Sequence, residues 1–185
     1  AQTKTVTILF TDLKGFTGIS EQLGPQGVGE LLNDYFTTMN EVIFEHGGCI
    51  DKFIGDAIMV FFGAPQDLNT KTQAEQAAAC GLAMQEKMKV LANRWAPKGV
   101  DDLSMRVGIH QGEAVVGNFG SSQRMDYTCI GPSVNLASRI ETACEPGLVY
   151  VSEPVFSQLV DGAATAVGEF ELKGIEGKNR LYRLV

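Results

Sequence analysis

The sequence predicts an α+β fold, an α/β sandwich in which helices cover a mixed sheet. The first observation is the order of its periodic segments: strand, helix, strand, strand, helix, strand, then an extension of shorter segments. The second is their periodicity, because the helical segments repeat apolar residues every three or four positions, whereas the strand segments are short apolar or alternating runs. A chain of 185 residues is one domain by length. We therefore expect a single domain over 1–185.

The first half of the chain supplies the long elements. We expect a buried strand, a helix preceded by a break at Gly24-Pro25, a hairpin with Gly55-Asp56 at its tip, and a second long helix capped by Asn69 or Thr70. These four elements are predicted at 6–11, 26–45, 49–63 and 69–95, respectively.

The second half supplies shorter elements. We expect an alternating strand at 103–109, a polar turn at 110–113, a returning strand at 114–120 and a short strand at 127–130. These are followed by a helix at 133–142, a strand at 148–151, a short helix capped by Ser152 at 152–159 and a final hairpin at 169–184.

Composition argues against several classes of function. A formal net charge of −7 disfavours nonspecific nucleic-acid binding, which needs a basic face. No apolar run approaches the ~20 residues that span a bilayer, so we expect no membrane contact from this segment. The four cysteines show no paired spacing, which disfavours a zinc site or a disulfide framework.

Two aspartates are candidates for binding a cation. Asp12 stands at the end of the first strand, before Gly15 and the start of a helical pattern, and Asp56 stands at the hairpin tip. If the hairpin lies beside the first strand, the two carboxylates converge and can hold divalent cations with positions open for a phosphate. The alternative is structural: Asp12 as a helix cap and Asp56 as a turn residue.

Three motifs resemble the catalytic domain of class III nucleotidyl cyclases, and the likeness is greatest to the bacterial adenylyl cyclases. The motifs are FTDLKGFT at 10–17, KFIGD at 52–56 and YTCIGPSVNLASR at 127–139. The resemblance implies a ferredoxin-like βαββαβ core of the polymerase-palm type with a C-terminal extension. It implies conversion of ATP into 3′,5′-cyclic AMP and pyrophosphate. The motif usually has Gly-Asp where Pro132-Ser133 stands, a difference that we interpret as neutral for the chemistry.

The same resemblance assigns metal and catalytic roles. It implies that Asp12 and Asp56, helped by the Leu13 carbonyl, bind two Mg²⁺ ions, for which Mn²⁺ can substitute. It places Asn135 near the ribose and Arg139 on the α-phosphate, where a charged fork stabilises the transition state. These two residues lie four apart on one helix, so the alternative is a solvated polar face.

Further residues are assigned to the substrate. The resemblance places Arg106 and Lys173 on the terminal phosphates, although Lys178 lies near enough in sequence to compete with Lys173. An arginine inside an apolar strand requires a partner in any case. The loop and helix start at Gly15, Phe16 and Thr17 are predicted to bind the phosphates through backbone N–H groups.

Lys52 and Thr128 occupy the positions that read the purine in this family. A lysine donates, which suits the N1 acceptor of adenine, whereas a threonine hydroxyl can donate or accept. Guanylyl cyclases typically carry Glu and Cys at these positions, and Cys129 stands one position too late. The pair therefore favours ATP.

The resemblance also implies an assembly. Metal-binding and catalytic residues of the family meet across a head-to-tail dimer, and this chain carries both sets, so we expect a homodimer with two composite sites. We expect a cytoplasmic catalytic domain cut from a longer protein with regulatory domains, which can itself be membrane-attached. The alternatives are a guanylyl cyclase and an inactive nucleotide-binding regulatory domain. A diguanylate cyclase is disfavoured because its glycine-glycine-acidic signature is absent.

Overall fold

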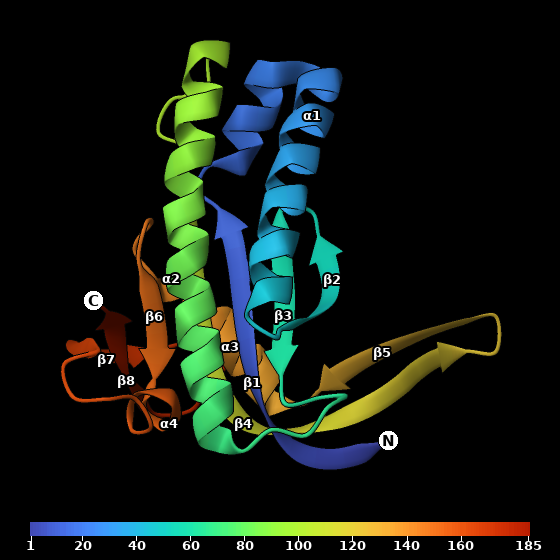
Figure 1. The fold of residues 1–185 in the computed structure, drawn as a ribbon, viewed down its shortest axis with the longest axis vertical. Helices are drawn as coiled ribbons and strands as arrows, with labels where there is room; N and C mark the ends of the chain where they lie inside the picture. Colours follow the sequence, from blue (N-terminus) through green and yellow to red (C-terminus); the bar gives the residue numbers. More distant parts are fainter.

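The computed structural model describes residues 1–185 as one eight-stranded sheet with helices on both faces (Figure 1). The strands are β1 (Gln2–Leu13), β2 (Cys49–Ile54), β3 (Ala57–Phe62), β4 (Met105–Ser121), β5 (Arg124–Ile130), β6 (Val149–Ser152), β7 (Ala164–Glu171) and β8 (Lys178–Leu184). The helices are α1 (Phe16–Glu45), α2 (Thr70–Trp95), a 3₁₀ turn (Ala96–Lys98), α3 (Pro132–Ala143) and α4 (Glu153–Phe156). No helix combines the length and apolarity that a bilayer crossing requires.

The strand order confirms the predicted fold. The sheet runs β2-β3-β1-β4-β6-β8-β7, with β5 pairing β4 off this path. Its first four members are the antiparallel β2-β3-β1-β4 sheet of a ferredoxin-like βαββαβ core. The extension adds β6 parallel to β4, and β8 and β7 continue antiparallel from β6.

The two faces of β1 pack against different helices, because alternate side chains of a strand point to opposite sides. Leu9 and Leu13 belong to the core beneath α1 and α2, which lie side by side over the sheet (Figure 1). Val6, Ile8 and Phe10 belong to a second core that includes Ala137 of α3. Asp12 follows the parity of this second set and therefore lies on the α3 side.

The long helices confirm two sequence signals, the Asn69 cap and the break at Gly24-Pro25. The Asn69 side chain caps α2 by accepting a 2.8 Å hydrogen bond from the Thr72 N–H. In α1 the predicted break is a kink, because Gly24 adopts φ 74° and ψ 175° immediately before Pro25. The helix begins at Phe16, where the sequence predicts a helix start, and the kink joins this first segment to the one predicted at 26–45.

The predicted turn at 110–113 is wrong. β4 continues through it, and its pairing with β1 is unbroken from Met105 to Val116. The polar residues that suggest a turn have buried partners in the fold. His110 Nδ1 lies 2.8 Å from Ser152 Oγ, and Gln111 Nε2 donates to Thr7 Oγ1 at 2.9 Å. Long-range hydrogen bonds therefore keep this polar stretch inside a strand.

The C-terminal elements agree with prediction apart from one helix. β7 and β8 form the expected antiparallel hairpin, although β7 begins earlier, at Ala164. α4 ends at Phe156 rather than near 159. Ser152 stands at its N-cap position, but its side chain does not cap the helix and lies against His110 instead.

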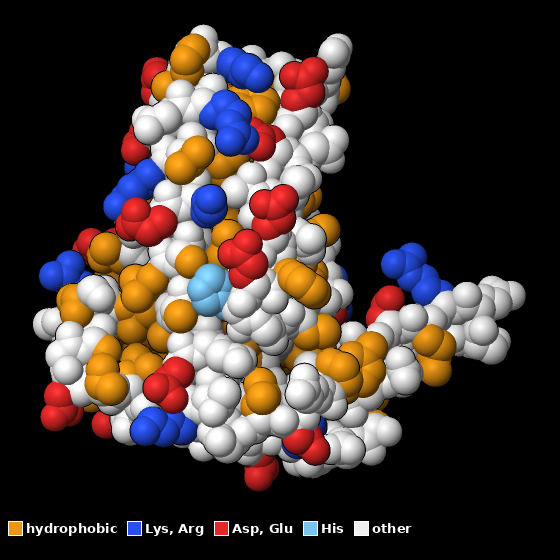
Figure 2. All heavy atoms as spheres, viewed as in Figure 1, with side chains coloured by type: hydrophobic (Ala, Val, Ile, Leu, Met, Phe, Trp, Pro, Cys, Tyr) orange, Lys and Arg blue, Asp and Glu red, His pale blue; other side chains and the backbone are white.

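A two-stranded arm leaves the body of the molecule. It consists of the end of β4 and all of β5, paired from Val115↔Ile130 to Ser121↔Arg124, and it projects well beyond the helices (Figure 1). Figure 2 shows the arm standing clear of the rest of the molecule, while charges of both signs are interspersed over the face formed by α1 and α2. Met125 on the arm is 57% exposed.

Candidate active site

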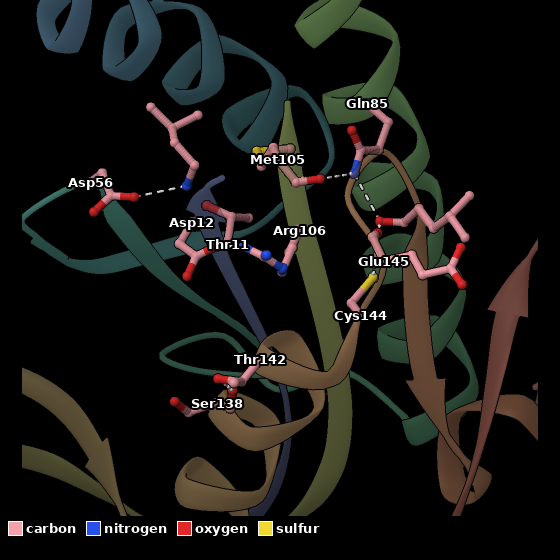
Figure 3. Close-up of polar contacts among 12 residues, drawn as sticks. Thr11, Asp12, Asp56, Gln85, Met105, Arg106, Ser138, Thr142, Cys144 and Glu145 are labelled. Atoms are coloured by element: carbon pink, nitrogen blue, oxygen red, sulfur yellow. Dashed lines mark hydrogen bonds and ion pairs between the residues drawn. The ribbon is translucent and has the colours of Figure 1, made fainter. Parts of the chain in front are cut away.

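Asp12 and Asp56 meet at one end of the sheet. β1 delivers Asp12, and the turn between β2 and β3 delivers Asp56, with Gly55 taking φ 59° at its tip. Asp56 Oδ2 accepts a 2.8 Å hydrogen bond from the Leu13 N–H, which ties the hairpin tip to the end of β1 (Figure 3). The convergence expected from the sequence is therefore present in the fold.

Arg106 lies directly across from Asp12. The two residues are register partners in the β1–β4 ladder, and Arg106 Nη1 is 3.5 Å from Asp12 Oδ1 (Figure 3). Burial raises the pKa of Asp12 and the Asp56 carboxylate adds to this effect, whereas the neighbouring Glu141 carboxyl and Arg106 oppose it. Asp12 Oδ1 is buried and accepts no hydrogen bond. A buried carboxylate oxygen in this state is suited to binding a cation.

Glu141 is a third carboxyl group at this end, and the sequence analysis missed it. It projects from α3 and is 5% exposed. Burial and the nearby Asp12 charge raise the pKa of Glu141 to about 8. Its position four residues after the buried Ala137, on the buried face of an amphipathic helix, is a signal that could have identified it.

Lys52 and Asn135 border one groove. The groove has a volume of about 440 Å³ and lies between the β2–β3 hairpin, β5 and the start of α3. Its walls are mostly apolar, and Lys52 and Asn135 are its polar side chains that can hydrogen-bond with a ligand. Arg139 follows Asn135 on α3 after about one turn, so both side chains project from the same side of the helix.

Thr128 and Lys52 are connected through a residue that the sequence analysis did not select. The Thr128 hydroxyl donates a hydrogen bond to Asp51 Oδ2, and Lys52 Nζ lies 3.5 Å from Asp51 Oδ1. Thr128 is 5% exposed, and the Asp51 side chain is fully buried. No local pattern identifies Asp51, because its contact with Thr128 joins strands that are distant in sequence.

The remaining candidates lie on loops and helix ends. Gly15 takes φ 64° at the N-cap of α1, so Phe16 and Thr17 open the helix with backbone N–H groups that have no helical acceptor. Lys173 lies in the turn between β7 and β8, where its neighbour Leu172 belongs to the same apolar cluster as Ile140 of α3. Lys178 begins β8 as the register partner of Glu171.

Comparison with known proteins identifies the family. The family model for the adenylate and guanylate cyclase catalytic domain matches residues 1–185. This chain belongs to that family. It is thus a cyclase catalytic domain, as the three motifs indicate.

Individual relatives support the same assignment. The cyclase domain is 39% identical over 136 residues to adenylate cyclase 1 of Rhizobium meliloti (strain 1021), covering 74% of this chain and 20% of that protein. The chain thus spans about a fifth of that relative's length. It also resembles the crystal structure of the adenylyl cyclase CyaB from P. aeruginosa, with a TM-score of 0.96 and 41% identity over 100% of this chain and 95% of that one.

A guanylyl cyclase is almost as similar. The crystal structure of the guanylyl cyclase Cya2 gives a TM-score of 0.92 and 37% identity, covering 99% of this chain and 92% of that one. Overall similarity therefore does not choose between adenine and guanine. The choice depends on the side chains that face the base.

Proposed function

We propose that this cyclase domain converts ATP into 3′,5′-cyclic AMP and pyrophosphate at sites shared between two copies of the chain. The observation that carries the proposal is the meeting of Asp12 and Asp56, where a buried Asp12 oxygen accepts no hydrogen bond. Two carboxylates so placed, next to the N-terminus of a helix, suit a metal–triphosphate substrate.

The chemistry of this donor set fits Mg²⁺. Asp12 and Asp56 provide two carboxylates, and Mg²⁺ is usually bound by one or two carboxylates plus substrate phosphates. Asp12, Asp56 and the Leu13 carbonyl would hold two such ions, with Mn²⁺ as a substitute. When bound, the metal neutralises phosphate charge and lowers the pKa of the attacking 3′-hydroxyl.

The other residues position the triphosphate and the sugar. Arg139 donates its charged fork to the α-phosphate, and Asn135 orients the ribose from the preceding turn of α3. Arg106 and Lys173 bind the terminal phosphates, and the N–H groups at Phe16 and Thr17 add to that binding. Arg106 already lies beside Asp12, so metal and phosphate contacts share one end of the sheet.

Lys52 favours ATP over GTP. Its ammonium group lines the groove and can only donate hydrogen bonds, which suits N1 of adenine and opposes the N1–H of guanine. A guanylyl cyclase remains the second candidate because Cya2 is 37% identical to this chain. The Lys52 side chain is the observation that separates the two.

A second copy of the chain completes the site in this proposal. Ile54 and Ile130 line the open groove, yet they are 53% and 49% exposed. Exposed apolar side chains around an open groove are typical of a surface that another molecule covers. The projecting arm offers a further surface for a partner copy. Regulatory domains elsewhere in a longer chain would act by changing how the two copies meet.

The direct test is product formation. The purified domain is incubated with ATP or GTP and with Mg²⁺ or Mn²⁺ over a range of protein concentrations. We expect cyclic AMP from ATP, with a rate per chain that rises with concentration as dimers form. Cyclic GMP as the main product would overturn the base assignment, and no cyclic product at any concentration would favour a regulatory domain.

A further inference from the structure

The base-reading residues meet at a buried carboxylate that has no assigned role. Asp51 is the extra residue of a β-bulge in β2, because Ile50 pairs with Val60 and Lys52 pairs with Met59. Neighbouring side chains of a regular strand point to opposite faces, and a bulge re-aims them. The bulge thus accounts for Asp51 lying close to the Lys52 ammonium.

The Thr128 hydroxyl has a single proton, and its hydrogen bond to Asp51 uses that proton. A threonine hydroxyl carries one donor and two acceptor lone pairs, whereas a carboxylate can only accept. The Thr128 hydroxyl donates to Asp51 Oδ2, and the Cys129 carbonyl, 3.4 Å from the same hydroxyl oxygen, is too distant to compete. Any further partner of Thr128 must therefore be a donor.

The second Asp51 oxygen faces Lys52. Asp51 Oδ1 is buried without a hydrogen bond, and Lys52 Nζ lies 3.5 Å from it. The Lys52 side chain is 45% exposed and borders the groove. Its ammonium group is therefore paired with Asp51 on the buried side and open to the groove on the other side. Lys52 lines that groove, whereas Asp51 and Thr128 are buried beside it and do not line it themselves. The bridge therefore lies directly behind the Lys52 side chain.

We propose that Asp51 is a positioning residue for base choice, because it fixes Thr128 as an acceptor next to Lys52, the donor that borders the groove. Adenine presents an acceptor at N1 and a donor at its 6-amino group, which match this pair. Guanine and hypoxanthine present N1–H and O6, which oppose it at both positions. Without Asp51, the Thr128 hydroxyl could rotate and either accept from the 6-amino group of adenine or donate to O6, so it would not distinguish the two kinds of base. This inference rests on the proposed function and specifies how the same site recognises its base.

The test compares ATP with ITP, because these differ at position 6 and N1 and both lack the 2-amino group of guanine. In Asp51→Asn the side-chain amide can donate to Thr128, which frees the hydroxyl proton to point at the base. We expect the ratio of kcat/KM for ATP over ITP to fall at least fivefold. Asp67→Asn is the matched control, since Asp67 pairs with Lys4 away from the groove and its loss should leave the ratio unchanged.

A double-mutant cycle separates positioning from general damage. In a Thr128→Val background the hydroxyl is gone, so Asp51→Asn should change the ratio less, by only the part that acts through Lys52. Thr128→Ser keeps the hydroxyl and should retain the ratio of the unmodified chain. An equal loss for both nucleotides with an unchanged ratio would overturn the inference, and so would an undiminished Asp51 effect in Thr128→Val. If Asp51→Asn fails to fold, Asp51→Ser is measured in the same way.

Binding keeps this test independent of catalysis. The 3′-deoxy forms of ATP and ITP lack the attacking hydroxyl, so their dissociation constants report recognition alone. A chain that makes no cyclic AMP but prefers 3′-deoxyATP, with that preference lost in Asp51→Asn, would sink the proposed function and support the role of Asp51. Cyclic AMP formation with an unchanged binding ratio in Asp51→Asn would support the proposed function and overturn the role of Asp51.

Discussion

Asp12 and Asp56 are held differently, although both are proposed to bind the metal. One Asp56 oxygen is occupied by the Leu13 N–H, whereas Asp12 has a buried oxygen without a hydrogen bond, beside Arg106. Truncation of Asp56 would therefore remove both a charge and a structural tether. An asparagine keeps an oxygen that can accept from Leu13, so it separates the two effects.

We predict that Asp56→Asn folds normally and loses at least about 100-fold in kcat, because a neutral amide is a poor ligand and removes one negative charge. Cyclic AMP formation and thermal unfolding are measured on the same preparation. Asp67→Asn serves as the control for an aspartate outside the site. An unchanged kcat in Asp56→Asn would exclude this residue as a metal ligand.

Glu141 should make the metal-free domain sensitive to pH. Its folded-state pKa is raised to about 8, so folding favours the protonated acid. That stabilisation is complete below the ordinary carboxyl pKa of about 4.5 and is lost as the pH rises through about 8. Glutamine stays neutral throughout. In EDTA, the unmodified domain should therefore lose stability between pH 5 and pH 8 relative to Glu141→Gln, on the order of 3 kcal/mol.

Urea unfolding at several pH values between 5 and 8 measures this difference. The midpoints of the two proteins should diverge as the pH rises, with Glu141→Gln the more stable at pH 8. Parallel midpoints would show that Glu141 is not held as the neutral acid.

At the scale of elements, the close approach of α3 to β4 builds the metal end of the sheet. A Cβ atom placed on Gly108 of β4 would lie 2.2 Å from the backbone N of Glu141. The atoms that this Cβ would meet belong to the α3 backbone, which cannot move aside as the end of a flexible side chain could. Gly108 thus permits the contact that brings Glu141 to Asp12, and this is a packing requirement rather than a need for an unusual φ.

We predict that Gly108→Ala destabilises the domain by about 3 kcal/mol, at the upper end of typical overpacking costs, because α3 must move away from the sheet. Gly29→Ala is the control, since its Cβ would meet nothing within 4 Å and it lies inside α1, where alanine is favoured. Thermal unfolding should separate the two variants clearly. Equal unfolding temperatures would contradict the close packing of α3 on β4.

The elements also show how far sequence reasoning extends. The core strands, the kink before Pro25 and the Asn69 cap follow from local signals, and the structure confirms them. The turn expected at 110–113 fails because the partners of His110 and Gln111 lie far along the chain. Asp51 and Glu141 are missed for the same reason. The contacts of these residues with Thr128 and Asp12 join segments distant in sequence; for Glu141 the helix periodicity places it on the buried face of α3 but does not name its partner.

At the scale of the whole molecule, the proposed site is open on a single copy of the chain. Lys52 and Asn135 border a groove with exposed apolar walls, and the arm of β4 and β5 projects without cover (Figure 1). In a homodimer with two composite sites, each site takes its metal residues from one copy and Arg139 from the other. Activity then becomes a property of the pair.

Mixing two inactive variants tests this central claim most directly. In a heterodimer of Asp56→Ala and Arg139→Ala chains, one site carries both defects and the other carries neither. If chains assort at random, half of the dimers are heterodimers and half of their sites are whole, so we predict recovery of about a quarter of the unmodified activity. No recovery, with heterodimers confirmed by differently tagged chains, would contradict a site shared between two copies.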